Sequence, residues 1–355
     1  MTNNKPYQDA VELLQKLIAT PSFSKEEDKT ADIIEQFFSK NNIPSNRLLN
    51  NVWAVNKYFD ENKQTILLNS HHDTVKPNAQ YTKDPFSPII EEGKLFGLGS
   101  NDAGGCLVSL ITAFCHFYEI KNLKYNIVIA ATAEEEISGK QGIESILSSL
   151  PKIDFAIVGE PTLTNLAIAE KGLLVLDCIV PGKAGHTARE EGDNAIYKAM
   201  QDISWFQHFQ FPKISETLGA VKMSVTSINT ENKAHNVVPA ACSFIVDIRV
   251  TDLYTHEEIL ETISEHVQSE IKPRSMRLRS SKIEKDNPLV RAGVKLGKQM
   301  YGSPTTSDAA LIPSAVLKCG PGDSARSHTA NEFIYLKEIE EGIETYIKLL
   351  EEINS

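Results

Sequence analysis

The run 127-IVIAATA-133 constrains the fold more than any other feature of this sequence. It is apolar on both faces, so a strand formed there must be covered on both sides. The apolar runs 65-TILL-68 and 155-FAIVG-159 predict neighbouring strands, and 103-AGGCLVSLITAFCHFY-118 predicts a helix. Because strands alternate with helices, we expect an α/β domain whose mixed sheet is covered by helices on both faces.

Two helices are expected before this sheet. Apolar residues between 7 and 20 recur with the spacing of an amphipathic helix. Ser24 and Glu27 then form an S-x-x-E pattern, which predicts a capping box ahead of a second helix that runs through Phe38.

The character of the sequence changes after Lys171. The runs 173-LLVLDCIV-180 and 237-VVPAACSFIVDIRV-250 predict longer strands, and helical stretches separate or follow them. This combination predicts a compact α+β domain inserted into the α/β domain. The predicted boundaries are 172–281 for the insert and 1–171 with 282–355 for the discontinuous domain.

Charge and cysteine content indicate which classes of partner and which cell compartment to expect. The chain carries 47 acidic and 36 basic residues and no long basic run, which argues against nucleic acid or an anionic membrane as the main partner. The five cysteines are scattered and form no C-x-x-C pair, so we expect neither a disulfide framework nor a thiolate zinc site. The N-terminus lacks a signal-peptide pattern and no run is long enough to span a membrane, so we expect a cytoplasmic protein.

Four polar clusters follow predicted strands, where α/β folds place their sites. In the first, His71 and Asp73 share one face of a strand. A histidine ligand commonly needs a carboxylate to orient its ring, so this pair suits a metal site. His72 points the other way and is not expected to be a ligand. A polar strand end without metal is the alternative for this cluster.

The next clusters add carboxylates. Asp102 lies in a glycine-rich turn ahead of a helix, where it could cap the helix or bridge two metal ions. The turn matches neither a dinucleotide fingerprint nor a P-loop. Glu135 and Glu136 follow the most apolar strand, where like charges repel unless a cation compensates them. Glu160 follows the next strand and could instead cap a turn.

A late histidine completes the set. His328 lies in the loop 320-GPGDSARSHTANEF-333 before the last predicted helix. The GDSA segment has the look of a serine-hydrolase turn, but no partnered His and Asp pattern accompanies it. Histidines and carboxylates at successive strand exits together describe a mixed nitrogen and oxygen site suited to zinc or a similar ion.

The motifs H-x-D, G-x-G-x-x-D, T-A-x-E-E, G-E-P-T and S-H-x-x-x-E occur in this order from about residue 65 to residue 333. Together they resemble the dizinc aminoacylase and acetylornithine deacetylase family, which includes succinyl-diaminopimelate desuccinylase and several di- and tripeptidases. The resemblance implies two zinc ions, with cobalt or manganese as substitutes. It implies that Asp102 bridges the ions, His71 and Glu160 complete one, Glu136 and His328 complete the other, Glu135 is the general base and Asp73 supports His71.

One departure from the family pattern lies beside the proposed bridge. Many members read D-M-K-G-G, whereas this chain reads Asp102, Ala103, Gly104 and Gly105, without the lysine. The zinc ligands are unaffected by this difference, but the assignment to a subfamily is weakened.

The resemblance extends to the insert and implies a ferredoxin-like lid and dimerisation domain. GKAGHTA matches a G-x-x-x-H element, which makes His186 an oxyanion donor in the partner subunit's site of a homodimer. NVVP and DIRV also match and offer Asn236 and Arg249 for the substrate carboxylate, a task that suits the arginine fork. The alternatives are a surface histidine for His186 and a structural salt bridge with Asp247 or a neighbouring residue for Arg249.

The expected activity is hydrolysis of the amide bond of a small N-acylated amino acid. N-acetyl-L-ornithine or N-succinyl-L-ornithine is the first choice, which implies a deacylase of arginine biosynthesis. Succinyl-diaminopimelate desuccinylase is the alternative favoured by 306-TSDA-309, followed by a dipeptidase or aminoacylase. A non-catalytic metal-stabilised binding protein would predict a missing ligand or base. A nucleotide-binding oxidoreductase would leave the glutamate clusters unexplained.

Overall fold

The computed structural model describes residues 5–189 and 191–355, which divide into two compact units. The first unit comprises the chain up to Ala169 together with Lys282–Tyr301 and Ser307–Ser355, and the second comprises Glu170–Ser281 and Gly302–Thr306. The sequence did not predict that the short segment Gly302–Thr306 belongs to the second unit. It belongs to the second unit because the Lys171 amide donates to the Ser303 carbonyl, and the Thr306 hydroxyl donates to the Lys171 carbonyl.

A nine-stranded mixed sheet forms the centre of the first unit. Its parallel part consists of β6, β3, β7 and β17, whereas β2 joins β6 and β8 joins β17 in antiparallel fashion. In sheet order the strands are β1 (Asn46–Leu48), β2 (Asn51–Val55), β6 (Asn126–Thr132), β3 (Thr65–His71), β7 (Phe155–Val158), β17 (Ala315–Lys318), β8 (Leu166–Glu170) and β15 (Ser281–Lys282), with β16 (Met300–Ser303) paired to β8. The predicted α/β class and mixed sheet are confirmed.

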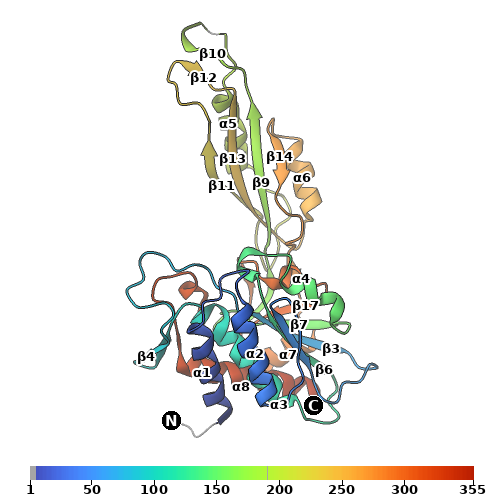
Figure 1. Ribbon diagram of the computed structural model, residues 1–355. Helices are drawn as coiled ribbons and strands as arrows, with labels where there is room; N and C mark the ends of the chain where they lie inside the picture. The colour runs from blue at the N-terminus through green and yellow to red at the C-terminus, as the bar shows by residue number, and fades with distance from the viewer. Residues whose placement is uncertain (1–4, 190) are drawn as a thin grey trace. The chain divides into compact units, whose positions relative to one another are not determined.

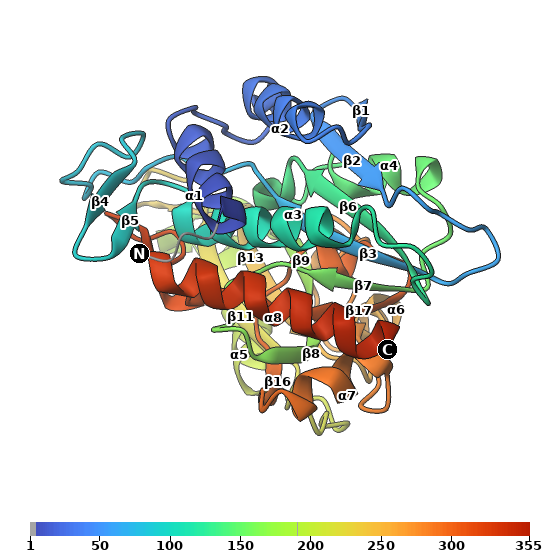
Figure 2. The same cartoon turned by 90° about the horizontal axis from the view of Figure 1, so that it is seen from below.

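Both faces of the central strands are buried. Alternate residues of β6 divide between two apolar clusters: Ile127 and Ile129 join one, and Val128 and Ala130 join the other. One face packs against five helices, among which α3 and α8 contact each other (Figure 2). These helices are α1 (Lys5–Ile18), α2 (Asp28–Lys40), α3 (Gly105–Phe117), α7 (Pro288–Lys295) and α8 (Leu336–Asn354). The other face packs against α4 (Ile143–Ile146) and the turns η3 (Leu147–Ser149) and η5 (Asp308–Ala310).

The predicted capping box before α2 is wrong. Glu27 is the residue at the N-cap position, and no side chain caps the helix. The Ser24 hydroxyl donates instead to Oδ2 of Asp73 at 2.7 Å. A serine hydroxyl in an S-x-x-E pattern can accept a hydrogen bond from an amide at the start of a helix, or it can donate one to a distant carboxylate. Here it donates to the distant carboxylate.

A small three-stranded sheet completes the first unit. It contains β4 (Ile89–Glu91), β5 (Lys94–Phe96) and β18 (Phe333–Tyr335), in the order β18-β5-β4. Because β18 directly precedes α8, this sheet fixes the end of the loop that carries His328.

Apart from the two-residue strands β10 and β12, the strands and α-helices of the second unit follow one another in the order β-α-β-β-α-β. Its antiparallel sheet has the order β11-β13-β9-β14, and α5 and α6 pack with one face of it in a single apolar cluster (Figure 1). The elements are β9 (Gly172–Pro181), α5 (Ala195–His208), β11 (Lys222–Asn229), β13 (Ala241–Val250), α6 (His256–Ser264) and β14 (Glu270–Pro273). Two short strands, β10 (Gly185–His186) and β12 (Val237–Val238), form a separate antiparallel pair, with the turn η4 (Thr187–Arg189) following β10.

Within the described ranges 5–189 and 191–355, no helix combines the length and apolarity that a bilayer span requires.

Candidate metal centre

The parallel strands bring the predicted polar clusters to one edge of the sheet. His71 is the last residue of β3 and pairs in register with Thr132, the last residue of β6. Glu160 follows the end of β7, which lies on the other side of β3. Parallel strands end at the same edge, so residues far apart in the sequence converge there.

His71 is the centre of this convergence and is 1% exposed. Its Nδ1 lies 3.0 Å from the carbonyl oxygen of Asp73 and 3.3 Å from Oδ1 of the same residue. Its Nε2 has no hydrogen-bond partner among the described residues, yet three carboxylates surround it. The distances from Nε2 are 3.4 Å to Asp102, 3.7 Å to Glu160 and 3.9 Å to Glu135.

Asp102 lies between two histidines. It is part of the turn η1 (Ser100–Gly104), in which it and Ala103 have non-helical backbone angles. One carboxylate oxygen faces His71, and the other lies 3.6 Å from Nε2 of His328. His328 Nε2 also lies 3.0 Å from Oε2 of Glu136. One carboxylate that presents its two oxygens to two separate donor groups has the arrangement of a bridging ligand.

The donor set fits divalent cations. Ligand atoms of His71, Asp102 and Glu136 lie within 4.8 Å of one another. An orphaned, buried imidazole nitrogen among carboxylates is costly unless a cation compensates it. Mixed imidazole and carboxylate donors are the ligands of zinc and similar ions. His71 and Glu160 could hold one ion and Glu136 and His328 the other, with Asp102 shared between them.

The electrostatics agree with this interpretation. Burial lowers the pKa of His71, but the charge of Glu135 and the contacts with the carboxylates of Asp102 and Asp73 outweigh it and raise the pKa well above its usual value. The hydrogen bond with Glu136 raises the pKa of His328 to about 9. A cluster that attracts protons to its imidazoles so strongly attracts a divalent cation for the same reason, and the cation then takes the place of the protons.

Glu135 lies beside the proposed metal ligands, at the start of the turn η2 (Glu135–Ile137). Burial raises the pKa of Glu135 well above its usual value, and the charges of Glu160, Asp308 and Glu136 raise it further, although His71 opposes them. A carboxyl group whose protonated form is favoured in this way is suited to act as a general acid and base.

Asp73 supports both the ligand and the base. Its carboxylate lies against Nδ1 of His71. The two carboxylate oxygens also accept hydrogen bonds from the backbone amides of Glu135 at 3.0 Å and of Glu136 at 3.2 Å. The other strand-end histidine, His72, has both ring nitrogens engaged, with the Thr30 hydroxyl and the Asn50 carbonyl oxygen. His72 is therefore unavailable as a ligand, which agrees with its predicted orientation.

Glu332 is a functional candidate to which the sequence pattern assigned no role. It is 2% exposed, and its carboxylate accepts hydrogen bonds from the backbone amides of Gly99, Asn101 and Asp102. These contacts hold the turn that presents Asp102. Its position in the S-H-x-x-x-E motif was a sequence signal for it. Its partners could not be predicted, because backbone amides occur at almost every position and form no sequence pattern.

The three residues expected from the insert lie in the second unit. His186 is exposed on β10, and its Nδ1 accepts a hydrogen bond from the Ala188 amide at 3.2 Å. Asn236 is exposed just before β12. Arg249 forms a bidentate pair with Asp247, at 2.8 and 3.0 Å, which is the alternative contact considered for it. The remaining predicted site residues come together in the first unit.

Comparisons with known proteins agree with this geometry. A model of the family Peptidase family M20/M25/M40 matches residues 67–352. Acetylornithine deacetylase of Buchnera aphidicola subsp. Schizaphis graminum is 28% identical, covering 91% of this chain and 92% of the relative. Succinyl-diaminopimelate desuccinylase 2 of a Ruegeria species is 26% identical over 74% of this chain and 70% of the relative.

The solved structure of an M20 family metallo-carboxypeptidase from Sulfolobus solfataricus has the same fold, with a TM-score of 0.77 at 17% identity over 99% of each chain. The family match spans the whole first-unit cluster, from His71 to His328. The chain therefore belongs to peptidase family M20/M25/M40 and is a metal-dependent hydrolase of that family.

Proposed function

We propose that this protein hydrolyses the amide bond of an N-acyl-L-amino acid with two zinc ions, and that N-acetyl-L-ornithine or N-succinyl-L-ornithine is its substrate. The observation that carries this proposal is Asp102, whose two oxygens face His71 and His328 while Glu135 lies beside them. The similarity to an acetylornithine deacetylase over most of both chains supports the choice of substrate. The product would then enter arginine biosynthesis.

The residues divide the chemistry between binding and proton transfer. His71, Glu160, Asp102, Glu136 and His328 would hold the ions, which supply a Lewis acid and lower the pKa of water to about 7. Glu135 takes a proton from the attacking water as its oxygen adds to the amide carbon. Glu135 then gives that proton to the amine as the carbon–nitrogen bond breaks. Asp73 holds the His71 ring and the two amides at the start of the Glu135 turn.

The second unit is proposed to recognise the substrate and to form a homodimer. His186 would donate a hydrogen bond to the oxyanion in the site of the partner subunit, while Asn236 and Arg249 would bind the substrate carboxylate. Preorganised donors aimed at the developing charge contribute strongly to amide hydrolysis. Because Arg249 is paired with Asp247, it would have to share its guanidinium between that residue and the substrate.

Mixing two inactive variants tests this shared site. Dimers of His186→Ala and of Glu135→Ala should each be nearly inactive. Random exchange of subunits should restore about a quarter of the wild-type activity, because half of the dimers are mixed and each mixed dimer has one intact site. Amine release after verified subunit exchange is the measurement. No recovery in such heterodimers would contradict the role of His186 in the partner's site.

The substrate is tested by amine release from a panel of amides. The panel contains N-acetyl-ornithine, N-succinyl-ornithine, N-succinyl-diaminopimelate and simple dipeptides, each offered to the zinc-loaded protein. We expect turnover of an acyl-ornithine that a chelator abolishes and added zinc restores. Preference for N-succinyl-diaminopimelate would favour the second candidate, which the similarity to a desuccinylase supports. Silence across the panel with zinc bound would favour a non-catalytic binding protein.

We also propose a cytoplasmic location. All five cysteines are free thiols, and four of them are buried. A chain with free thiols and without disulfides suits a reducing compartment.

A further inference from the structure

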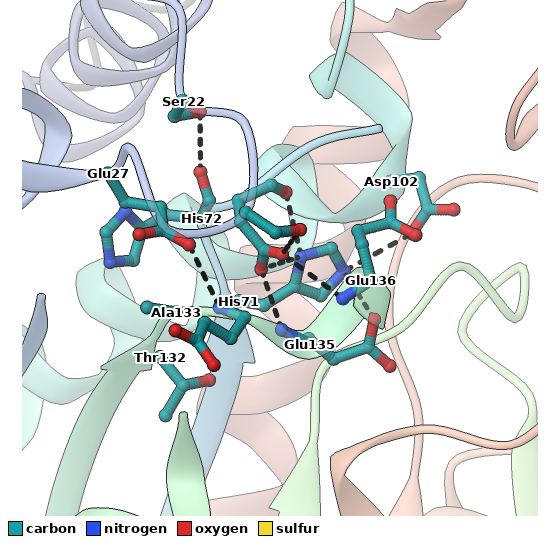
Figure 3. A network of polar contacts seen from close by, with 12 residues as sticks. Ser22, Glu27, His71, His72, Asp102, Thr132, Ala133, Glu135 and Glu136 are labelled. Atoms are coloured by element: carbon teal, nitrogen blue, oxygen red, sulfur yellow. Dashed lines mark hydrogen bonds and ion pairs between the residues drawn. The ribbon is translucent and has the colours of Figure 1, made fainter. Parts of the chain in front are cut away.

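The turn that carries Glu135 and Glu136 is held by carboxylates, which accept hydrogen bonds from its backbone amides. Asp73 accepts those of Glu135 and Glu136. The preceding amide, of Glu134, donates to Oε1 of Glu27 at 3.1 Å. Three successive amides of the turn are therefore bound by two carboxylates. Figure 3 shows Glu27 pointing toward the chain at Ala133, on the side opposite Asp102.

The backbone needs this support at Glu134. Its φ is 54°, in the left-handed region that costs a residue with a side chain free energy. Glu134 lies between the end of β6 and the turn η2, so its conformation sets the direction in which the chain leaves the strand. A hydrogen bond to its amide therefore orients the two functional glutamates that follow.

Glu27 is at the N-cap position of a helix, yet its side chain is fully buried. Its carboxylate accepts the amide of Glu134, a residue 107 positions later in the chain. Its Oε1 also accepts the Lys25 amide at 2.7 Å, and its Oε2 accepts the Asn50 side-chain amide at 2.8 Å. The donors in these three contacts are neutral N–H groups. Burial of a carboxylate is costly unless such bonds offset it, so the position is stable only while the whole set is in place.

The same segment also holds the turn after His71. The Ser22 hydroxyl donates to the carbonyl of His72 at 2.8 Å (Figure 3). The Ser24 hydroxyl donates to Oδ2 of Asp73 at 2.7 Å. The segment from residue 22 to residue 27 therefore contacts both strand ends that carry the histidine ligand and the base. This accounts for the S-x-x-E pattern that does not cap α2.

We propose that Glu27 is a positioning residue for the hydrolytic reaction. By holding the amide of Glu134, it fixes the start of the turn on which Glu135 moves the proton and Glu136 serves as a ligand. The inference rests on the proposed function for its kinetic consequence. Its expected effect on zinc affinity does not require that reaction, because it depends only on the position of the proposed metal ligands.

Alanine and glutamine substitutions separate positioning from simple stability. Glutamine keeps an oxygen that accepts the Lys25 and Glu134 amides and loses only the acceptor for the Asn50 side chain, whereas alanine removes both acceptors. We expect Glu27→Ala to lower kcat and the zinc affinity by about 10- to 100-fold in protein that is folded by circular dichroism, with KM nearly unchanged. Glu27→Gln should retain kcat within a few-fold. Glu26→Ala, an exposed neighbour, is the matched control and should equal the wild type.

Each outcome bears on the proposal. A folded Glu27→Ala protein with wild-type kcat and zinc affinity would overturn it, and so would a glutamine variant as impaired as the alanine variant. If Glu27→Ala does not fold, Glu27→Asp takes its place, with an expected several-fold loss of kcat and of zinc affinity, because the shorter side chain cannot reach the Lys25, Asn50 and Glu134 donors at once. If the wild type turns over no amide, the proposed function fails, and the zinc titration by chelator competition still decides the role of Glu27.

Discussion

Replacement of Glu135 by glutamine is expected to lower kcat by about 10²- to 10⁴-fold, the usual contribution of a positioned general base. Glutamine has nearly the same shape but cannot take the proton from water or return it to the amine. The backbone amide of Glu135 would still donate to Asp73, so the turn should keep its conformation. Initial rates of amine release by the zinc-loaded variant are the measurement.

The matched control is Glu351→Gln, an exposed glutamate of α8, which should retain wild-type kcat. KM and the zinc content of Glu135→Gln should remain near those of the wild type, because Glu135 is not among the proposed ligands. If kcat fell by less than ten-fold while zinc remained fully bound, another group would have to move the proton.

Replacement of Asp102 by asparagine is expected to produce the largest loss of metal. Its two oxygens face His71 and His328, so a neutral amide in their place weakens both proposed sites at once. We expect the affinity for zinc to fall by about 100-fold or more and the activity to fall with it. Chelator competition and elemental analysis of the dialysed protein measure the effect.

Asp286→Asn, at an exposed position, is the control and should bind zinc like the wild type. If Asp102→Asn kept one tightly bound ion and lost the other, Asp102 would be a ligand of a single ion. Retention of both ions with wild-type affinity would contradict its assignment as a ligand.

The convergence of the proposed metal ligands was predictable because it depends on topology. His71, Glu136 and Glu160 each follow a short apolar run, and such runs predict parallel strands with a common edge. The structure brings their side chains together at that edge. The pattern of the α/β domain thus predicts that most of the proposed ligands lie close together.

The supporting contacts were not predictable from local patterns. Ser24 and Glu27 match a capping box, but their partners are Asp73 and the amide of Glu134. Nothing within a few residues distinguishes these two outcomes. Glu332 is similar, since it acts on backbone amides that every sequence possesses. The Arg249 pair with Asp247 is local, at i and i+2 on one strand, and was therefore foreseen as an alternative.

The most direct test of the two-metal centre is anomalous diffraction at the zinc edge from crystals of the zinc-loaded protein. The proposed ligand set predicts two peaks on either side of Asp102, one beside His71 and Glu160 and the other beside Glu136 and His328. A single peak, or peaks that do not contact Asp102, would contradict the assignment on which the proposed hydrolysis depends.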